Sequence, residues 1–217
     1  MEKIVIVFSV VLLFFSACPQ NRNQLIKDKT SPATQSQTEE KTNSSLETKS
    51  NEQKEKSVQE KLFSSIAGNK SIIVEYLVNK EKADVNSKNK NGISALVYSI
   101  LYLQYRGQFR IIKFLIEKGA DVNLPCDNGK TPLIYAAGVG HGETIDLLIE
   151  HGADINYNGA EGTALMEAVK MDKPKTIKIL LDKGADINIK SIKGKTALDF
   201  AREQENTEII NILEKSK

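Results

Sequence analysis

The chain has few of the residues from which catalytic and metal sites are usually built. Among its 217 residues there are two histidines, His141 and His151, and two cysteines, Cys18 and Cys126. A zinc site needs three or four converging ligands, and a hydrolytic triad needs a nucleophile, a base and an orienting acid. No spacing in the sequence brings such groups together, so we expect no catalytic residue, no metal site and no cofactor.

Phosphate-binding loops are also missing, although two fragments match the end of one. These are Gly129-Lys130-Thr131 and Gly194-Lys195-Thr196. A P-loop needs another glycine five positions earlier, where Leu124 and Ile189 stand instead. The glycine-rich stretch 138–142 joins two predicted helices, whereas a dinucleotide site needs a strand before it. We therefore expect no nucleotide and no small-molecule substrate.

No apolar run is long enough to cross a bilayer as a helix. The longest is Ile4–Phe15, twelve residues broken only by Ser9, whereas a spanning helix needs about 20. This length is typical of a secretory signal peptide, which we predict over residues 1–17. The sequence Phe15-Ser16-Ala17-Cys18 resembles a bacterial lipobox, which implies a lipid anchor with fatty acids such as palmitate on Cys18. The alternative is an ordinary secretory signal followed by an incidental cysteine.

Apolar residues are almost absent from Pro19 to Glu60. The segment consists mainly of Gln, Asn, Ser, Thr, Lys and Glu, so it cannot bury enough surface to offset the entropy lost on folding. It contains seven basic and seven acidic residues, so it has no net positive charge that would attract it to anionic lipid. We predict that residues 18–60 form a lipidated, disordered tether with a mean reach of roughly 35 Å.

Two short patterns recur through the rest of the chain. The first is Ala-Asp-apolar-Asn, whose aspartates are 37, 33 and 32 residues apart: Asp84, Asp121, Asp154 and Asp186. The second is Ser or Thr, then a small residue or Pro, then Leu, beginning at Ser94, Thr131, Thr163 and Thr196. Each unit contains two helical stretches with apolar residues at i, i+3 and i+4. Such a pair cannot bury its apolar side alone, so the units must stack.

With both patterns in phase over four units, the chain resembles the ankyrin-repeat family. The resemblance implies an all-α solenoid over residues 61–217, with about five helix-turn-helix repeats joined by β-hairpin fingers. The family's histidine after Thr-Pro-Leu is replaced in every unit, by Val97, Ile134, Met166 and Asp199. The first and last units lack part of the pattern, and we interpret them as caps that meet solvent on one side.

One predicted helix has two apolar sides. Leu96, Ile100 and Leu103 form one of them, while the other carries residues spaced i, i+3, i+4 and i+7: Tyr98, Leu101, Tyr102 and Tyr105. The stack needs only part of this surface, and exposed tyrosine clusters are good binding anchors. We therefore expect the three tyrosines to bind a partner. The alternative is that the lengthened turn over residues 101–107 covers them.

Lysines gather at the tips of the predicted fingers. They are Lys88, Lys90, Lys130, Lys190, Lys193 and Lys195. Six lysines face two acids there, although the whole chain has a net charge of only +2. We expect them to steer an acidic protein surface toward the fingers, the alternative being that they are simply solvated turn residues.

These patterns together predict a non-catalytic protein–protein interaction module. The family implies recognition through the fingers and the first helices, which line a concave face. We expect a monomer, anchored by lipid to a bacterial membrane and located in the cell envelope outside the cytoplasm. Nucleic acid is not an expected partner because the chain is exported. The alternative function is an accessory subunit or inhibitor of an envelope enzyme.

Overall fold

The computed structural model describes residues 58–103 and 107–216 of the chain. The predicted signal peptide, Cys18, most of the predicted tether and Tyr105 lie outside these residues. Residues 58–67 are helical, so helical structure is present three residues before the expected boundary at residue 61. None of the described helices is both long enough and apolar enough to cross a bilayer.

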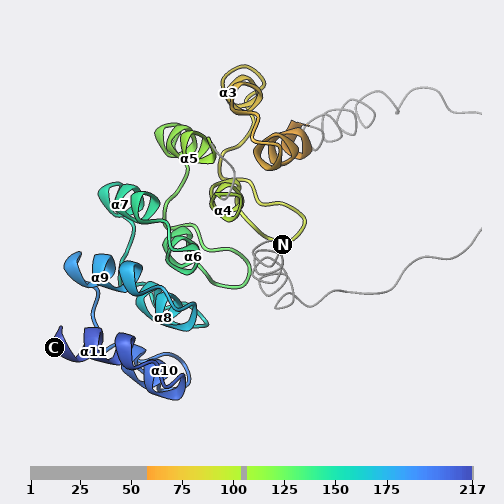
Figure 1. The fold of residues 1–217 in the computed structure, drawn as a ribbon. Helices are drawn as coiled ribbons and strands as arrows, with labels where there is room; N and C mark the ends of the chain where they lie inside the picture. The colour runs from red at the N-terminus through yellow and green to blue at the C-terminus, as the bar shows by residue number, and fades with distance from the viewer. Residues whose placement is uncertain (1–57, 104–106, 217) are drawn as a thin grey trace, which may run out of the picture. The chain divides into compact units, whose positions relative to one another are not determined.

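The helices come in pairs along the chain (Figure 1). The helical residues 58–67 precede α3 (Ser71–Asn79), and the following pairs are α4 (Ala95–Leu101) with α5 (Gln108–Glu117), α6 (Pro132–Val139) with α7 (Gly142–Glu150), α8 (Ala164–Lys170) with α9 (Pro174–Asp182), and α10 (Ala197–Glu203) with α11 (Thr207–Lys215). The first helices α4, α6, α8 and α10 pack on one another in one layer, and the second helices form another. This is the all-α repeat stack that the sequence predicts.

The Ser or Thr of the second pattern marks the start of each first helix. The hydroxyls of Ser94, Thr163 and Thr196 each accept a hydrogen bond from the backbone N–H three residues later, at 3.3, 3.3 and 3.2 Å. At the fourth start, the buried hydroxyl of Thr131 has no partner among the described residues. There Pro132, with its fixed φ, occupies the first helical position instead.

The second helices end with a residue in the left-handed conformation. Gly119, Gly152 and Gly184 have φ angles of 88°, 87° and 92°. Glycine adopts this conformation readily because it has no Cβ. In the first unit Lys82 takes the same role with φ 57°, so this helix end holds a side chain in a region that L-residues seldom adopt.

The Ala-Asp-apolar-Asn pattern joins each unit to the next. The Asp121 carboxylate accepts a hydrogen bond from the backbone N–H of Asn123 at 2.8 Å, which makes a tight turn. The Asn123 side chain then donates to the Gly152 carbonyl at 2.8 Å and accepts from the Asp154 N–H at 2.8 Å. Asn86 and Asn156 also accept from the aspartate N–H of the following unit, at 2.7 and 2.9 Å. We call these contacts the asparagine clips.

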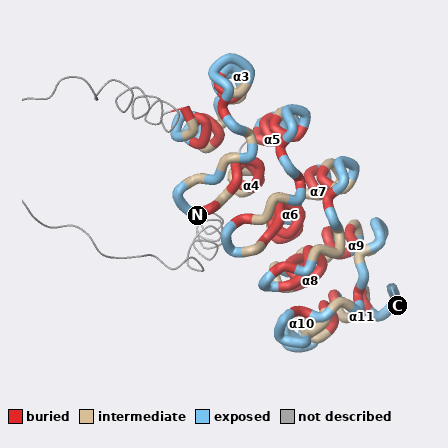
Figure 2. Tube along the Cα trace, turned by 180° about the vertical axis from the view of Figure 1, so that it is seen from behind, coloured by how far each residue is buried: buried red, intermediate tan, exposed pale blue. Residues whose placement is uncertain are grey.

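The core lies between the two helix layers (Figure 2). The leucine of the second pattern is buried in every unit: Leu96, Leu133, Leu165 and Leu198. Ala136 and Ala137 have no exposed surface, and their small side chains let the neighbouring helices of the inner layer approach closely. Leu148, on the second helix of the same unit, is also fully buried.

Tight turns join the units where β-hairpin fingers were expected. We call residues 87–94, 124–131, 157–163 and 189–196 fingers 1 to 4. Fingers 1 and 3 contain isolated antiparallel bridges, Lys88 with Ser94 and Gly159 with Gly162. Backbone N–H groups in fingers 2 and 4 donate across the turn to the Lys130 and Lys195 carbonyls, at 3.0 and 2.9 Å. The described residues include no longer strand.

Candidate protein-interaction surface

The fingers lie beyond the first helices, on the side opposite the second helices (Figure 1). Neighbouring fingers are bonded to one another. The Asp127 N–H of finger 2 donates to the Gly92 carbonyl of finger 1 at 3.1 Å, and the Asn158 side chain of finger 3 donates to the Lys190 carbonyl of finger 4 at 2.9 Å. A Cβ on Gly159 would lie 2.4 Å from the Gly129 carbonyl oxygen, so fingers 2 and 3 approach too closely for another residue there. The fingers are therefore held in place before any partner arrives.

The lysines of finger 1 are exposed but paired. The Lys88 ammonium lies 2.9 Å from an Asp127 carboxylate oxygen, and the Lys90 ammonium lies 2.8 Å from one of Glu60. The hydrogen bond that Lys90 donates to the Glu60 carboxylate raises the pKa of Lys90. Exposed ion pairs contribute little to stability. Both lysines can therefore exchange their present acid for one on a partner at small cost.

Lys130 does not project from finger 2, which corrects the expectation from the sequence. Its side chain is 8% exposed, and its ammonium lies 3.0 Å from carboxylate oxygens of both Glu161 and Glu167 in the following unit. Burial alone would lower the pKa of Lys130, but the two carboxylates outweigh burial and leave the pKa above its usual value. Lys130 thus links two units, and a partner could reach its charge only by breaking this cluster.

Finger 4 presents the most accessible combination of side chains. Lys190 and Lys193 are exposed, and Ile192 between them is 75% exposed. Lys195 is partly covered, because it pairs with Glu203 and its ammonium lies 5.8 Å from the centroid of the Phe200 ring. The repeat pattern of the sequence predicts that Ile192 projects from this finger, and the structure exposes it. Its exposure makes it an apolar contact flanked by two cations.

The tyrosines of α4 are partly covered by the first unit. The rings of Phe63 and Tyr98 meet edge to face with centroids 5.4 Å apart, and the Tyr98 and Tyr102 centroids lie 5.0 Å apart. Burial, with a contribution from the hydrogen bond to Tyr102, raises the pKa of Tyr98 to about 12. Tyr98 and Tyr102 each keep an intermediate exposure. The helical residues 58–67 thus cover part of the tyrosine stripe, while Tyr105 lies outside the described residues.

Lys170, at the end of α8, was not foreseen as part of this surface. Its ammonium donates to the Glu161 carbonyl at 2.6 Å and lies 4.7 Å from the centroid of the Phe200 ring. Burial lowers the pKa of Lys170. Lys170 and Phe200 place a cation against an aromatic face between fingers 3 and 4. The sequence alone offers little indication of the contact between Lys170 and Phe200, because the two residues are 30 positions apart.

Cys126 in finger 2 is a buried free thiol. Burial raises the pKa of this thiol, which lowers the fraction present as the reactive thiolate. Among the described residues, no group of three or more His, Cys, Asp and Glu side chains could hold a metal ion. The chemistry available on this surface is therefore that of charge, hydrogen bonding and apolar contact.

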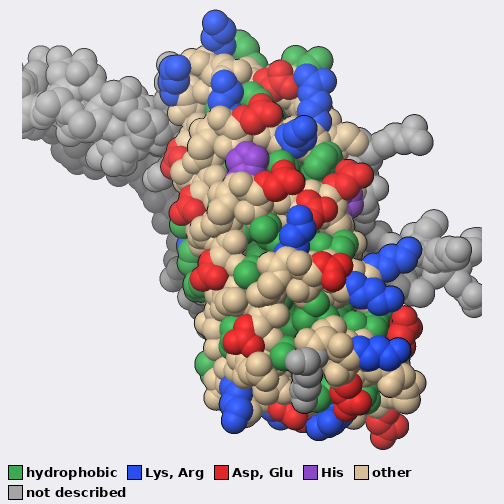
Figure 3. Space-filling model, turned by 90° about the vertical axis from the view of Figure 1, so that its left-hand side faces the viewer, with side chains coloured by type: hydrophobic (Ala, Val, Ile, Leu, Met, Phe, Trp, Pro, Cys, Tyr) green, Lys and Arg blue, Asp and Glu red, His purple; other side chains and the backbone are tan. Residues whose placement is uncertain are grey.

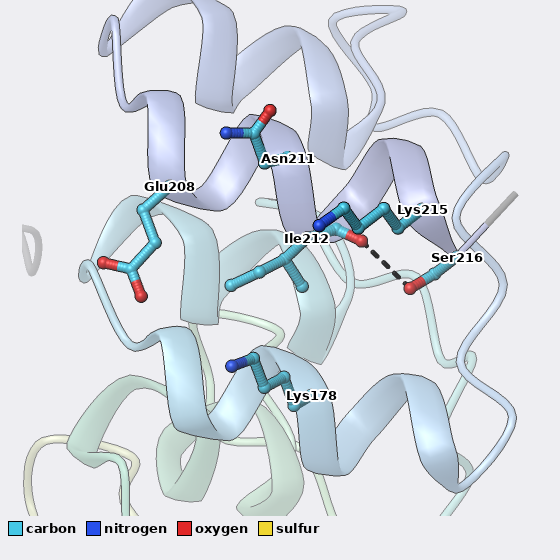
Figure 4. Close-up of a pocket in the computed structure, with 6 residues that line it drawn as sticks. All are labelled: Lys178, Glu208, Asn211, Ile212, Lys215 and Ser216. Carbon is cyan, nitrogen blue, oxygen red and sulfur yellow. Dashed lines mark hydrogen bonds between the residues drawn. The ribbon is translucent and has the colours of Figure 1, made fainter.

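The face formed by the second helices is different, because positive and negative side chains are mixed over it (Figure 3). A pocket of 400 Å³ on the outer layer is lined by residues of α9 and α11 and the residue after α11: Lys178, Glu208, Asn211, Ile212, Lys215 and Ser216. In Figure 4 the Ser216 hydroxyl donates to the Ile212 carbonyl at 3.0 Å. These side chains include no nucleophile positioned beside a base, so the pocket does not resemble a reaction site.

Comparison with known proteins agrees with this architecture. A protein-family model described as "Ankyrin repeats (3 copies)" matches residues 47–125, 103–191 and 157–217. Among curated proteins, Alpha-latrocrustotoxin-Lt1a of Latrodectus tredecimguttatus is 34% identical over 99 residues, covering 45% of this chain and 7% of the toxin.

Two mouse proteins are also similar to this chain over part of its sequence. The 2-5A-dependent ribonuclease of Mus musculus is 36% identical over 73 residues, which is 34% of this chain and 10% of the enzyme. The RelA-associated inhibitor of Mus musculus is 40% identical over 76 residues, which is 35% of this chain and 9% of that protein. The matched segment thus spans a tenth or less of the length of each of these relatives.

Proposed function

Since the chain belongs to the ankyrin-repeat family, whose repeats are protein–protein interaction modules, we propose that its fingers and first helices bind another protein without catalysing a reaction. The observation that carries this proposal is finger 4, where Ile192 is 75% exposed between two exposed lysines. An exposed apolar side chain on a turn that is held by hydrogen bonds can pack against a partner without a change in the backbone.

The proposed partner has an acidic surface. Lys88, Lys90, Lys190, Lys193 and Lys195 supply positive charge along the fingers, whereas Lys130 is removed from the set because Glu161 and Glu167 already neutralise it. Tyr98, Tyr102 and Tyr105 form a second, smaller part of the proposed contact. The charge would mainly raise the rate of association, and the apolar contacts would mainly slow dissociation.

We further propose that the protein is tethered to a bacterial membrane and acts in the cell envelope. The support is the sequence: a twelve-residue apolar run, Cys18 three residues after its end and a polar segment before the repeats. In this proposal the protein is monomeric and binds no nucleic acid. Incorporation of labelled fatty acid into the parent protein, and its loss in Cys18→Ser, tests the anchor. A parent protein that takes up no label would refute it.

The partner can be identified by capture from detergent-solubilised envelope with the parent protein as bait. The key variant carries Lys190→Glu, Lys193→Glu and Lys195→Glu. It should associate with the captured protein roughly tenfold more slowly at low ionic strength and almost as fast as the parent at high ionic strength. Stopped-flow or surface-plasmon measurements give these rates.

The matched control reverses three exposed lysines of the outer layer, Lys175, Lys178 and Lys215. It changes the net charge by the same amount and leaves the fingers intact, so its association rate should fall much less. Equal slowing in both variants would show that net charge, and not the fingers, determines binding.

The tyrosine contact is tested separately by Tyr102→Ala. If the stripe binds, this change weakens capture more than it lowers the melting temperature. A lower melting temperature with unchanged capture would assign the stripe to the packing of α4 on the first unit. An enzyme among the captured proteins, with activity altered by this chain, would favour the alternative role of accessory subunit or inhibitor.

A further inference from the structure

The first unit carries an apolar surface that the proposed function does not use. On α3, Ile72 is 77% exposed, Ile73 is 43% exposed and Tyr76 is 54% exposed. We call these three residues the α3 patch. Apart from them, the one large apolar side chain exposed to a similar degree among the described residues is Ile192 of finger 4.

The repeat itself shows why Ile73 is exposed. In each of the first four units the N–H of the landmark alanine donates to a leucine of the second helix: Leu77, Leu115, Leu148 and Leu180. Ile73 stands four residues before Leu77, and the same position in the next three units is occupied by Ile111, Thr144 and Thr176. Those three side chains are 1%, 0% and 1% exposed. The position is buried in later units, where a second helix packs before it.

Within the α3 patch, Ile73 points away from the next unit. Glu75 pairs with Arg110 of α5 at 2.8 Å, so that side of α3 faces the next unit. Ile73 lies two residues from Glu75, and residues so spaced point in nearly opposite directions on a helix. The helix α3 that carries the patch lies at the end of the stack formed by the first unit (Figure 1).

Lysines surround the patch at both ends of α3. Lys70 precedes the helix, Lys80 and Lys82 follow it, and all three are exposed. Lys61 on the preceding helix is exposed as well. Within the described residues none of these four lysines forms an ion pair. Two acids lie among them in the sequence, Glu81 and Glu75, and Glu75 pairs with Arg110. Figure 3 shows basic and hydrophobic side chains together at its upper end, where α3 lies in Figure 1.

We propose that the α3 patch docks on the surface of an anionic membrane. Lysine is depleted at protein–protein interfaces, whereas at a membrane its long stem follows the apolar boundary and its ammonium meets anionic headgroups. Isoleucine can enter the acyl region, and tyrosine favours the boundary between acyl chains and headgroups. Three apolar side chains are also too few to bury the area of a stable dimer. These features together favour a lipid surface over a second copy of the chain.

The consequence is a defined orientation. This inference extends the proposed function and rests on it for the nearby membrane, since the proposed anchor at Cys18 precedes the same end of the stack. A lipid on a long tether gives proximity without orientation. The docked α3 patch would set the first unit against the bilayer and direct finger 4 away from it, toward a partner.

The test uses the absence of tryptophan from the chain. Tyr76→Trp places a single indole in the patch of the otherwise complete protein, and Ile192→Trp places one on finger 4 as a control of similar exposure. Each protein is mixed with vesicles rich in phosphatidylglycerol or made of phosphatidylcholine, with acyl chains brominated near the headgroup. Quenching of the indole emission by bromine reports contact with the acyl region.

We expect anionic vesicles to quench the indole at position 76 about twofold or more and to leave that at position 192 almost unchanged. Adding Lys70→Gln, Lys80→Gln and Lys82→Gln should remove most of this quenching, as should raising the salt concentration. Adding Ile72→Ser and Ile73→Ser should remove it at any salt concentration.

Two results would overturn the proposal. The first is an indole at position 76 that stays unquenched on anionic vesicles. The second is a blue-shifted emission without bromine quenching, because that places the patch against protein, either a second copy or the chain's own N-terminal residues. Failure of the anchor is distinguishable, since it appears as absence of fatty-acid label on the parent and leaves quenching by added vesicles unaffected.

Discussion

Lys130 and Lys195 stand at the same place in the repeat, yet their surroundings differ. Each follows a glycine and precedes the threonine that begins a first helix. The Lys130 side chain is 8% exposed and contacts two acids of the following unit, whereas that of Lys195 is 39% exposed and pairs with Glu203 of its own unit. Within the described residues, another unit follows the one that contains Lys130, whereas no unit follows the one that contains Lys195. The position of a unit in the stack, and not its local sequence, decides the burial of this residue.

The largest expected effect tests that comparison directly. Lys130→Ala leaves Glu167, which is 2% exposed, in the interior without its cation. Removing one partner of a buried ion pair costs about 3–5 kcal/mol of the free energy of unfolding, while Lys195→Ala should cost at most about 1 kcal/mol. Denaturant unfolding of both variants measures these values. Equal losses would show that the two lysines make equivalent contributions despite their different burial.

A second pair compares the centre of the stack with its first unit. Leu148→Ala removes a fully buried side chain between helices and should cost about 2–5 kcal/mol. Ile72→Ala removes one that is 77% exposed and should change the free energy of unfolding by less than about 0.5 kcal/mol. Thermal and denaturant unfolding provide the comparison. A loss at Leu148 within experimental error would mean that the register of the helices is mistaken.

A third pair concerns two helix starts inside the stack. The Thr163 hydroxyl accepts from the Met166 N–H at 3.3 Å, so Thr163→Val should cost about 1 kcal/mol of stability. Thr131→Val removes a buried hydroxyl that lacks a partner among the described residues, so stability should be unchanged or should rise by up to about 1 kcal/mol. If Thr131→Val proved as costly as Thr163→Val, the Thr131 hydroxyl would have to be hydrogen-bonded in solution, for example to a bound water molecule.

The smallest effect concerns the ends of the second helices. Lys82→Gly relieves a non-glycine residue at φ 57° and should stabilise the protein by about 0.5–1 kcal/mol. The reciprocal change Gly152→Lys should destabilise it by a similar amount, and through conformation alone, because a Cβ there has no heavy atom within 4 Å. Melting temperatures that move in the same direction for both variants would contradict this explanation.

Features determined by neighbouring residues could be predicted from the sequence. The helix starts at Ser94, Thr163 and Thr196 and the turns at the landmark aspartates depend on bonds that span two or three residues. Their residue types therefore identify them directly, and the repeated spacing shows that the units stack.

Features that depend on distant residues could not be predicted in this way. Glu167, which pairs with Lys130, lies 37 residues later in the chain. The ring that packs against Tyr98 belongs to Phe63 in the preceding unit. Ile73 matches the core pattern of its helix, and only its place in the first unit leaves it exposed. The sequence pattern describes an average unit, whereas the candidate surfaces arise where individual units differ from it.

The asparagine clips bear on how such a chain can change its length. In each clip the asparagine side chain accepts from the same backbone group of the following unit, the aspartate N–H, regardless of which two units it joins. The following unit has no Ala-Asp landmark for Asn188, and the Asn188 side chain donates instead to the Asp186 carboxylate of its own turn at 3.1 Å. Duplication of the segment 124–156 would therefore create a junction with the same bonds as those already present. A gene encoding this protein could gain or lose whole units while both end surfaces, the α3 patch and finger 4, remained as they are.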